Sequence, residues 1–431
     1  MEDIQTWLRE GWQEFTYQQG ELCCEEVSLN HLAREVGLPF YVYSSRSIRE
    51  AFLSYKEGFG DQKHIIAYAV KANENLSIIH LLRQLGAGAD IVSVGQLYRA
   101  QLAGIPGHKI LYSGVGKTDR EIRAALEAGI LFFNVESEEE LVRISQISEE
   151  VQIRAGIAIR INPDVDPKTH PYISTGMKEH KFGVEIPAAI ELYRRAEADP
   201  WLEVRGIQCH IGSQITEPSP HREALERVLM VRAQLSEMGI ETRYIDLGGG
   251  LGIRYSEEEP PAPAEFVRGL LEIAGGLDVS WILEPGRSIV GNSGALVCQV
   301  LYRKEHGGKH YTIVDAGMND LIRPAIYEAF HPILPVCQSD QPDHRIHTEV
   351  VGPICESTDQ FAWDRSLPPL EQKDLLAILA AGAYGAAMSS NYNAKPFCPE
   401  ILVDGKEWRL IRRRQTIEEL VAFEREFLAE A

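Results

Sequence analysis

The sequence lacks the features that mark several large classes of protein. Its seven cysteines form no CxxC pair, so neither a zinc site nor a disulfide framework is indicated. No apolar run approaches the length needed to span a bilayer, and the polar, acidic N-terminus has no hydrophobic stretch of the kind found in signal peptides. Internal repeats and low-complexity tracts are also missing. We therefore expect a cytoplasmic protein with reduced thiols, no metal and no membrane contact.

Positive charge is scarce as well. The chain has 43 lysine and arginine residues against 63 aspartate and glutamate residues, which gives a formal net charge of -20. The acidic residues are spread along the chain with only short clusters, such as 138–140 and 257–259. This distribution is typical of a solvated acidic surface that keeps a protein soluble. Nucleic acids and anionic membranes are therefore poor candidate partners.

What the sequence does contain is the composition of a globular protein. Hydrophobic residues make up 44% and charged residues 25% of the 431 residues, a balance that supports a real core. A chain of this length is too long for one domain of ordinary size, so two domains are expected. One of them has room to be a barrel of about 250 residues.

Short apolar runs alternate with longer amphipathic stretches from about residue 38 to residue 285. This alternation is the pattern of repeated βα units with a parallel sheet. Eight runs are present, and each but the last is followed by a helix-like segment, which favours a closed (β/α)8 TIM-type barrel over an open doubly wound sheet. The predicted strands are Ile65–Val70, Ala89–Val94, Lys109–Gly114, Ile130–Val135, Ile157–Asn162, Arg205–Gly212, Arg243–Gly250 and Trp281–Gly286.

The pattern of the sequence changes after this region. Segments such as SGALVCQVLYRKE, KHYTIVDAG and RIHTEVVGP indicate strands without regular helices between them. Residues 286–431 are therefore predicted to form a mainly β domain. Residues 1–37 are assigned to the same domain, because eight strands already complete the barrel without them.

Polar residues stand at the ends of four predicted barrel strands. In parallel barrels the chemistry gathers at the carboxyl ends of the strands, so these residues are candidate site residues. Lys71 directly follows the first apolar run, where desolvation would lower the pKa of its amine and leave it able to form a Schiff base. The alternative is a lysine that extends its amine to solvent at a strand end, and spacing alone does not separate the two.

A glycine-rich turn, GGGLG, begins at Gly248 after the seventh predicted strand. Its backbone N–H groups can close around a phosphate, and the hydroxyl of Ser213 at the end of the sixth strand can bind the same anion. A tight turn without a ligand is the alternative. The turn does not match GxGxxG, and no acidic ribose ligand follows at the expected place, so a nicotinamide dinucleotide is disfavoured.

Two further residues at these strand ends suit an aromatic cofactor. Glu284 can pair with a protonated ring nitrogen, and His210 has a flat face that can stack on a ring. Taken singly, they have ordinary structural explanations, namely a core histidine and a buried ion pair between Glu284 and Arg287. Together with a lysine amine and a phosphate-binding turn, they meet the requirements of pyridoxal 5'-phosphate (PLP).

These residues resemble a known family, the fold-type III PLP-dependent decarboxylases with an alanine-racemase-like barrel, and within it the diaminopimelate decarboxylases. The similarity covers the chain from about Leu38 to Glu400, and its motifs are jointly specific. They are YAVKAN (68–73), RINPDV (160–165), THPYISTG (169–176), KFG (181–183), CHIGSQI (209–215), DLGGGLG (246–252), EPGRSIV (284–290), DAGMNDLIRPAIY (315–327), VVGPICESTD (350–359) and AGAYGAAMSSNYN (381–393).

The resemblance implies decarboxylation of meso-2,6-diaminopimelate to L-lysine and CO2, the last step of lysine biosynthesis, with PLP as cofactor. It makes Lys71 the Schiff-base lysine and Cys355 the proton donor. In the family, the CES segment completes the active site of the neighbouring subunit, which implies a homodimer with shared active sites. The residues implied to bind the cofactor are Lys71, His210, Ser213, Gly249, Gly250, Glu284, Gly286, Arg287 and Tyr384.

The candidate substrate-binding residues fit the charges of diaminopimelate. The distal end of this substrate is a zwitterion, so its carboxylate requires arginines and its ammonium requires a carboxylate. Ornithine or lysine would need an acidic pocket without the arginines, and a guanidinium substrate would need carboxylates. The residues that supply the set are Arg287, Arg323, Tyr327 and Glu356, and the resemblance adds Tyr384.

Several alternatives remain open. The nearest is a sister decarboxylase that acts on a carboxylated polyamine precursor or a citryl-diamino acid. A racemase is disfavoured because the CES and RPAIY segments do not resemble those that carry a second base. A catalytically inactive binding partner would be expected to have lost residues such as Lys71, Glu284 or Cys355, which are all present. One departure from the family is Gln96 in SVGQL, where the family usually carries glutamate.

Overall fold

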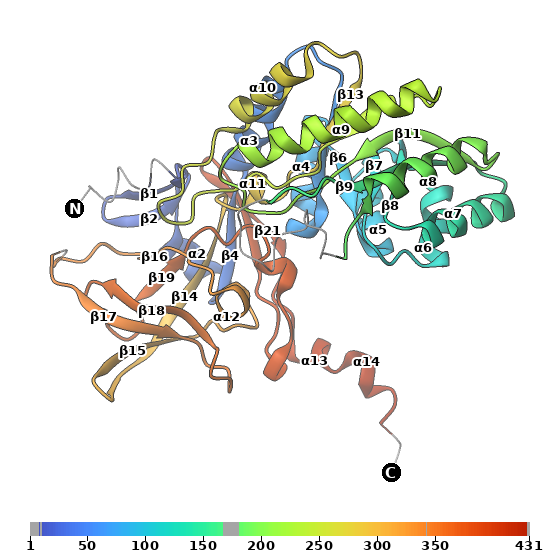
Figure 1. The fold of residues 1–431 in the computed structure, drawn as a ribbon. Helices are drawn as coiled ribbons and strands as arrows, with labels where there is room; N and C mark the ends of the chain where they lie inside the picture. Colours follow the sequence, from blue (N-terminus) through green and yellow to red (C-terminus); the bar gives the residue numbers. More distant parts are fainter. Residues whose placement is uncertain (1–7, 9–10, 167–180, 342, 429–431) are drawn as a thin grey trace. The chain divides into compact units, whose positions relative to one another are not determined.

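The computed structural model describes residues 8, 11–166, 181–341 and 343–428 (Figure 1). The chain divides into two compact units. The first, called here the β unit, comprises Met1–Ile48, Arg254–Glu258 and Ile289–Ala431. The second, the barrel unit, comprises Arg49–Ile253 and Glu259–Ser288. The motif THPYISTG lies outside the described residues.

Eight parallel strands form a closed ring in the barrel unit, which confirms the predicted fold class. They pair in chain order from β5 to β13, and the pairing of β13 with β5 closes the ring. A short strand, β10 (Val184–Glu185), pairs with β9 in addition. The ring strands are β5 (His64–Ala69), β6 (Gly88–Ile91), β7 (Ile110–Tyr112), β8 (Phe132–Val135), β9 (Ala155–Asn162), β11 (Leu202–Gln208), β12 (Tyr244–Asp246) and β13 (Ser280–Leu283).

Helices connect the strands, because parallel neighbours can be joined only by a crossover. Local sequence starts several of them. Thr118 and Glu121 form a capping box at the start of α6, and Ser137 caps α7 by accepting a hydrogen bond from the N–H of Glu140. The barrel helices are α4 (Leu76–Leu85), α5 (Val94–Leu102), α6 (Asp119–Glu127), α7 (Glu138–Val151), α8 (Ile186–Ala198), α9 (Ser219–Glu237) and α10 (Pro263–Ala274), and α3 (Ser45–Phe59) spans the unit boundary.

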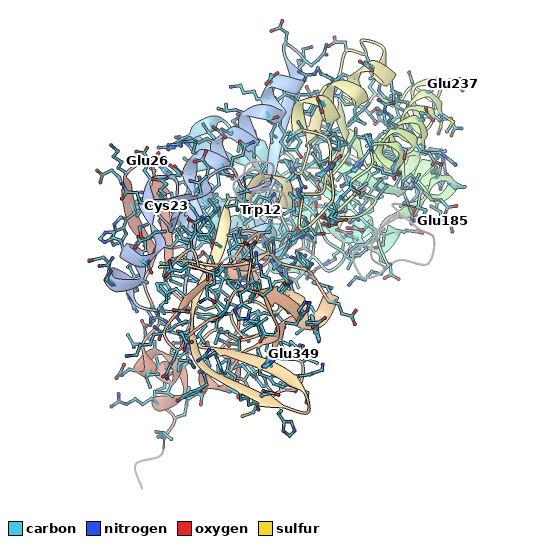
Figure 2. All side chains as sticks on the ribbon, turned by 90° about the vertical axis from the view of Figure 1, so that its left-hand side faces the viewer. Trp12, Cys23, Glu26, Glu185, Glu237 and Glu349 are labelled. Carbon is cyan, nitrogen blue, oxygen red and sulfur yellow. The ribbon has the colours of Figure 1, made fainter. Side chains whose placement is uncertain are left out.

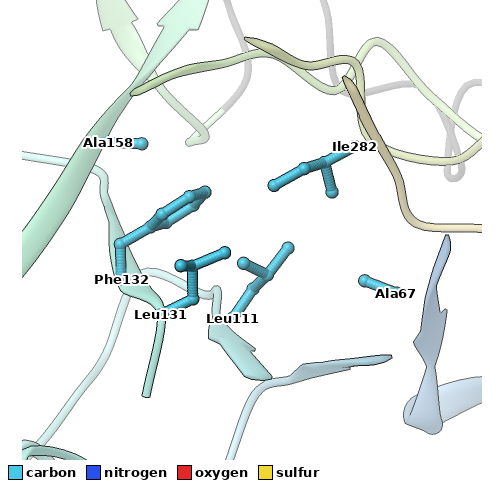
Figure 3. Close-up of a cluster of buried hydrophobic side chains, with 6 residues drawn as sticks. All are labelled: Ala67, Leu111, Leu131, Phe132, Ala158 and Ile282. Carbon is cyan, nitrogen blue, oxygen red and sulfur yellow. The ribbon is translucent and has the colours of Figure 1, made fainter. Parts of the chain in front are cut away.

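Apolar side chains fill the inside of the ring. The strands read as continuous apolar runs because both of their faces are covered, and in β9 every residue except Asn162 is buried. One cluster of buried residues joins five strands across the ring (Figure 3). Its members are Ala67, Leu111, Leu131, Phe132, Ala158 and Ile282.

Phe132 is the largest side chain of this cluster and has no exposed surface. We expect Phe132→Ala to lower the free energy of unfolding by about 3 to 5 kcal/mol, because it removes a buried ring and leaves a cavity. Chemical denaturation followed by circular dichroism measures the change. Phe132→Leu, which keeps most of the volume, should cost clearly less. Equal destabilisation by the two variants would contradict packing at this position as the cause.

The β unit contains a mixed sheet and a small antiparallel one. The mixed sheet has the strand path β18-β17-β15-β14-β4-β20-β21, and β19 and β16 extend it from β14. The strands are β1 (Phe15–Gln18), β2 (Glu21–Cys24) and β3 (Val27–Ser28) in the small sheet, and β4 (Phe40–Ser44), β14 (Gly294–His306), β15 (Lys309–Val314), β16 (Ile333–Pro335), β17 (Ile346–Val351), β18 (Gln360–Leu367), β19 (Leu375–Ile378), β20 (Glu400–Asp404) and β21 (Glu407–Arg412) in the mixed sheet.

Strand β4 falls within the range expected for the barrel but pairs in the β unit. It lies between β14, to which it is antiparallel, and β20, to which it is parallel. All five of its residues are buried. The β unit therefore extends through Ile48 at the N-terminal side, beyond the boundary that was expected at residue 37.

The β unit also carries short helices and a packed interior. Figure 2 marks Trp12 and Cys23, which are both buried, among its side chains. The helices are α2 (Leu29–Val36), α11 (Arg287–Val290, at the unit boundary), α12 (Arg323–Tyr327), α13 (Ile417–Leu420), α14 (Ala422–Arg425), η4 (Ala386–Met388) and η5 (Tyr392–Ala394). Within the described ranges, no helix has both the length and the apolar character that a membrane crossing requires.

Candidate active site

Lys71 is held at the carboxyl end of strand β5. It lies in the short 3-10 helix η1 (Val70–Ala72), and its Nζ atom is 2.6 Å from Oδ2 of Asp90 on strand β6. Asp90 has no exposed surface, whereas the Lys71 side chain is 37% exposed. A buried carboxylate is costly unless it is paired, so Asp90 fixes the amine while one side of the lysine stays accessible. This arrangement differs from a lysine that extends freely into solvent.

Gly286 brings the end of strand β13 against the Lys71 segment. A Cβ atom at this position would lie 2.9 Å from Cβ of Ala72 and 3.0 Å from Cβ of Ala69. These two alanines flank the pair Val70 and Lys71 in the chain. The N–H of Ala69 also donates to the carbonyl of Pro285 at 3.0 Å. Glycine at position 286 is therefore required for the close approach of the two strand ends.

The turn Gly248–Gly250 follows strand β12 and has the shape of a backbone cradle. Gly248 and Gly250 have φ angles of 65° and 114°, in the left-handed region that favours glycine. A Cβ at Gly249 would lie 2.3 Å from the carbonyl oxygen of Glu284, and one at Gly250 would lie 2.6 Å from that of Gly212. Side chains are thus excluded where N–H groups line the turn, which fits the binding of a phosphate.

Ser213 and Arg287 lie beside one another in the same unit. The Nε and Nη2 atoms of Arg287 donate to Oγ of Ser213 at 3.3 and 3.1 Å. Arg287 is 6% exposed. A hydroxyl oriented by a buried guanidinium is suited to an anion, because both groups donate hydrogen bonds.

His210 contacts the glycine turn through its ring. Its Nδ1 accepts a hydrogen bond from the N–H of Gly249 at 3.2 Å, so Nδ1 carries no proton in this arrangement. Burial, together with the positive charges of Arg160 and Lys71, lowers the pKa of His210 well below its usual range. The imidazole is therefore neutral at physiological pH and presents an uncharged ring.

Glu284 is buried at the end of strand β13 among polar side chains. Its Oε1 accepts from Nδ2 of Asn134 at 3.2 Å and from Nε2 of Gln208 at 3.4 Å. Asp246 on strand β12 also has no exposed surface, and its Oδ1 accepts from the N–H of Gly248 at 2.9 Å. Neither carboxyl group stands alone, since they are hydrogen-bonded to one another.

Both carboxyl groups are biased toward their protonated forms. Burial raises the pKa of Glu284 well above its usual range, and the negative charges of Asp246 and Asp90 add to this effect. Burial likewise raises the pKa of Asp246 to about 7, while its hydrogen bond with Glu284 acts in the opposite direction. Glu284 is therefore biased toward its protonated form, which suits it to hold a proton opposite a ring nitrogen.

The raised pKa of Asp246 predicts a pH dependence of stability. Between about pH 4 and about pH 7 the folded protein keeps a proton that the unfolded chain has lost, so the free energy of unfolding falls as the pH rises through this window. Asp246→Asn removes this carboxyl group. The difference in the free energy of unfolding between the two ends of the window should then be smaller, by about 1.4 kcal/mol for each unit by which the pKa of Asp246 is raised. Urea unfolding of the cofactor-free protein at both ends of the window measures it. Asp61→Asn, an exposed change, is the control, and an unaltered slope in Asp246→Asn would contradict a raised pKa at Asp246.

In the β unit, Cys355 and Glu356 lie on an exposed turn that one carboxylate holds in place. Asp359 accepts from the N–H groups of Ile354 and Met318, both at 2.6 Å. The N–H of Cys355 donates to Oδ1 of Asn393 at 3.3 Å. Asp359 is buried, and burial raises its pKa. It thereby joins the CES segment to the DAGM segment that leads into α12.

Arg323 begins α12 and is 6% exposed. Its Nη1 lies 2.8 Å from Nε2 of His331, and Nδ1 of His331 donates to the carbonyl of Leu379 at 2.9 Å. His331 is therefore neutral and accepts from the guanidinium. The guanidinium carbon also lies 4.7 Å from the ring centroid of Tyr255. These contacts hold one cation in a defined place.

The two candidate tyrosines are both half-buried. Tyr327 ends α12. Tyr384 has a φ angle of 56°, which is rare for a tyrosine, and follows the tightly packed Gly382, where a Cβ would lie 1.8 Å from the carbonyl oxygen of Val290. Such a constrained segment fixes the direction in which the Tyr384 side chain leaves the backbone.

Gln96 has a defined role in this structure. Its Oε1 accepts from the N–H of Val92 at the end of β6, and its Nε2 donates to Oε1 of Glu74 at 2.7 Å. The side chain is 4% exposed. The amide thus ties the segment after Lys71 to strand β6, and a carboxylate at this position would face the carboxylate of Glu74.

Several residues at the strand ends were missed by sequence reasoning. Asp90, Asn134, Gln208 and Asp246 surround the predicted set, and all four are buried. A signal was available for two of them, because Asp90 and Asp246 are charged residues inside apolar runs. The predicted barrel residues Lys71, His210, Ser213, Gly249, Gly250, Glu284, Gly286 and Arg287 belong to the barrel unit, and Arg323, Tyr327, Cys355, Glu356 and Tyr384 belong to the β unit.

Comparisons with known proteins agree with this chemistry. The family model "pyridoxal-dependent decarboxylase, pyridoxal binding domain" matches residues 45–291. The diaminopimelate decarboxylase of Aquifex aeolicus is 50% identical over 406 residues, which are 94% of this chain and 96% of that protein. The diaminopimelate decarboxylase of Helicobacter pylori complexed with L-lysine has a TM-score of 0.89 and 46% identity, covering 93% of this chain and all of that one. The M. jannaschii enzyme with L-lysine has a TM-score of 0.91 at 38% identity and covers 96% of this chain and 98% of that one.

Fold and strand-end chemistry thus define a PLP-dependent decarboxylase with an alanine-racemase-like barrel. Its cofactor is PLP, and the glycine cradle and buried carboxyl group described above fit that group. Within this class, the chain belongs to the diaminopimelate decarboxylase family.

Proposed function

We propose that this protein decarboxylates meso-2,6-diaminopimelate to L-lysine and CO2, the last step of lysine biosynthesis. The observation that carries the choice of substrate is Arg323, a nearly buried guanidinium held by His331 and Tyr255. A buried arginine suits a substrate that keeps a second carboxylate. L-lysine, which is bound in the H. pylori and M. jannaschii enzymes, is the expected product here.

The barrel residues would hold the cofactor. The N–H of Gly250, the Ser213 hydroxyl and Arg287 would bind its phosphate, and Gly249, whose N–H donates to His210, would leave room for the phosphate at the turn. His210 would stack on its ring, and Gly286 keeps the Lys71 segment close. PLP, when bound, withdraws electrons from the substrate Cα and so supports the loss of CO2. Glu284 holds a proton at the ring nitrogen, for which its raised pKa suits it. Asp90 orients the Lys71 amine.

The β-unit residues would bind the substrate and complete the reaction. Arg323 binds the distal carboxylate together with Arg287 and the hydroxyls of Tyr327 and Tyr384, and Glu356 binds the distal ammonium. Cys355 delivers a proton from its Sγ to Cα after CO2 has left. The product should be a single enantiomer, because a proton from Cys355 would reach Cα from one fixed side.

We also propose a homodimer with shared active sites, in which Cys355 and Glu356 of one subunit serve the barrel of the other. Both residues lie on an exposed turn whose backbone Asp359 holds rigidly. A rigid exposed turn with a thiol and a carboxylate is suited to insertion into a neighbouring subunit. A cytoplasmic location and the absence of nucleic-acid partners are further parts of this proposal, supported by the acidic composition.

The substrate test measures CO2 and L-lysine from PLP-loaded protein. We expect meso-diaminopimelate to react and L-ornithine, L-arginine and L-lysine to be inert, because only the first carries the distal carboxylate. Lys71→Ala should lose the near-visible absorption band of the bound cofactor and all turnover. Activity on a different amino acid alone would move the protein to a sister decarboxylase, and an absent band in wild-type protein would contradict PLP binding through Lys71.

The dimer test mixes two inactive variants. Lys71→Ala and Cys355→Ala proteins, combined under conditions that exchange subunits, should recover activity, because one site of each heterodimer regains both residues. The recovered fraction should approach about one quarter of the wild-type activity at equal mixing, since about half of the dimers are mixed and each has one intact site. Subunit exchange is followed by differently tagged chains. Exchange without recovered activity would refute the shared site.

A further inference from the structure

Strands β8 and β9 are neighbours in the barrel (Figure 1). A chain of buried charges lies at their carboxyl ends. Arg160 on β9 and Glu136, which directly follows β8, are both 6% exposed. Nη1 of Arg160 lies 2.8 Å from Oε1 of Glu136. The second oxygen of Glu136 accepts from the N–H of Gly183 at 2.8 Å. Both oxygens of this carboxylate are therefore used, and the geometry of the ion pair is fixed.

Glu136 is itself anchored from the other side. Its backbone N–H donates to Oε2 of Glu140 at 2.8 Å, and Oε1 of Glu140 pairs with Nζ of Lys117 at 2.5 Å. Lys117 is almost completely buried and also donates to the carbonyl of Asn134 at 2.8 Å. The ion pair of Glu136 and Arg160 thus belongs to a network of hydrogen bonds that is anchored to the barrel backbone at the carbonyl of Asn134.

At its other end, the network contacts His210, a residue of the candidate cofactor site. Nη2 of Arg160 donates to the carbonyl oxygen of His210 at 3.4 Å. The ring of His210 in turn accepts the N–H of Gly249, a member of the glycine turn. A continuous path therefore leads from Glu136 through Arg160 and His210 to Gly249, and none of the roles proposed above uses its first two residues.

The contact between His210 and Gly249 exists only while the imidazole is neutral. Protonation of Nδ1 would turn the acceptor into a donor and set it against the N–H of Gly249. The charged and titratable groups that act on His210 include Arg160 on β9, Lys71 on η1 and His221 on α9. Arg160 is the largest charge contribution, and the three of them act in the same direction. Loss of the Arg160 charge would therefore ease protonation of His210.

We propose that Arg160, held by Glu136, is a positioning residue that keeps His210 in place and its Nδ1 available to Gly249, and so maintains the phosphate-binding turn. The inference rests on the proposed roles of His210 and the glycine turn in cofactor binding. A purely structural ion pair would stabilise the barrel without affecting affinity for the phosphate group. The two possibilities therefore differ in a measurable way.

The test compares cofactor affinity in cofactor-free protein at about pH 6 and about pH 8, on either side of neutrality. The variant is the double change Arg160→Gln with Glu136→Gln, which removes both charges without leaving one buried and unpaired. PLP binding is followed by its near-visible band. We expect the dissociation constant to rise about tenfold at the lower pH, the effect of one lost charge-assisted hydrogen bond, and clearly less at the higher pH.

The matched control uses an ion pair at the opposite end of the barrel. Arg205 pairs with Glu203 at 2.6 Å on strand β11, the strand that leads to His210. The change Arg205→Gln with Glu203→Gln should leave PLP affinity unaltered at both pH values. Arg160→Lys, which keeps a positive charge, should restore much of the affinity at the lower pH and serves as the second variant if the double change impairs folding.

Pyridoxal, which lacks the phosphate, separates an effect on the turn from an effect on the whole site. We expect the double variant to bind pyridoxal nearly as well as the wild type does. Equal losses for PLP and pyridoxal, or unchanged PLP affinity at both pH values, would overturn the inference. His210→Ala and Gly250→Ala test the underlying site, because unchanged PLP affinity in those variants would refute the proposed site itself.

Discussion

Closure of the parallel barrel is the constraint on which the rest of the site depends. Because every strand runs in the same direction, the carboxyl ends meet at one rim of the ring. The pairing of β13 with β5 sets Glu284 and Gly286 beside the Lys71 segment, although more than half of the barrel sequence separates them. The bond between Ala69 and Pro285 continues that pairing beyond the strands. A barrel without this closure would leave the amine and the carboxyl group on different edges.

Several acidic residues are buried at the carboxyl end of the ring. Asp90, Asp246 and Glu284 are all buried, and Lys71 pairs with Asp90. Burial, together with the negative charges of neighbouring carboxylates, raises the pKa of both Asp246 and Glu284, and the positive charge of Lys71 acts in the opposite direction on Glu284. The same electrostatics favour any ligand that brings a cationic group to Glu284. The site is therefore electrostatically prepared for a basic ring nitrogen.

Sequence patterns predicted the barrel well because its strands are buried on both faces and read as apolar runs. Strand β4 is an element whose sheet the sequence pattern could not identify. Its sequence, FYVYS, is as apolar as a barrel strand, and periodicity cannot tell which sheet it joins. Partners far away in the chain decide that question, since β4 pairs with β14 and β20.

The candidate site was predictable to the extent that its residues stand in recognisable motifs at strand ends. Lys71, His210 and Glu284 follow apolar runs, and the glycine turn is visible as such. Asn134 and Gln208 were missed, because an amide inside a strand gives no sign that it will face a carboxyl group across the ring. Arg160 was visible only as part of a motif, and its contact with His210 depends on the pairing of β9 with β11. Such contacts follow from the closed fold, which local sequence does not specify.

The two units divide the chemistry by the kind of support that each group needs. The barrel residues act on a charged, aromatic cofactor, and they sit on strand ends whose positions the ring fixes. The β-unit residues would act on a flexible substrate, and they sit on turns, where carboxylates such as Asp359 replace sheet pairing as the anchor. Asp359 binds two backbone N–H groups from two segments, so movement of the Cys355 turn would also disturb the segment that leads to Arg323. In the proposed mechanism, proton delivery by Cys355 and recognition of the distal carboxylate by Arg323 would therefore be coupled through the buried side chain of Asp359.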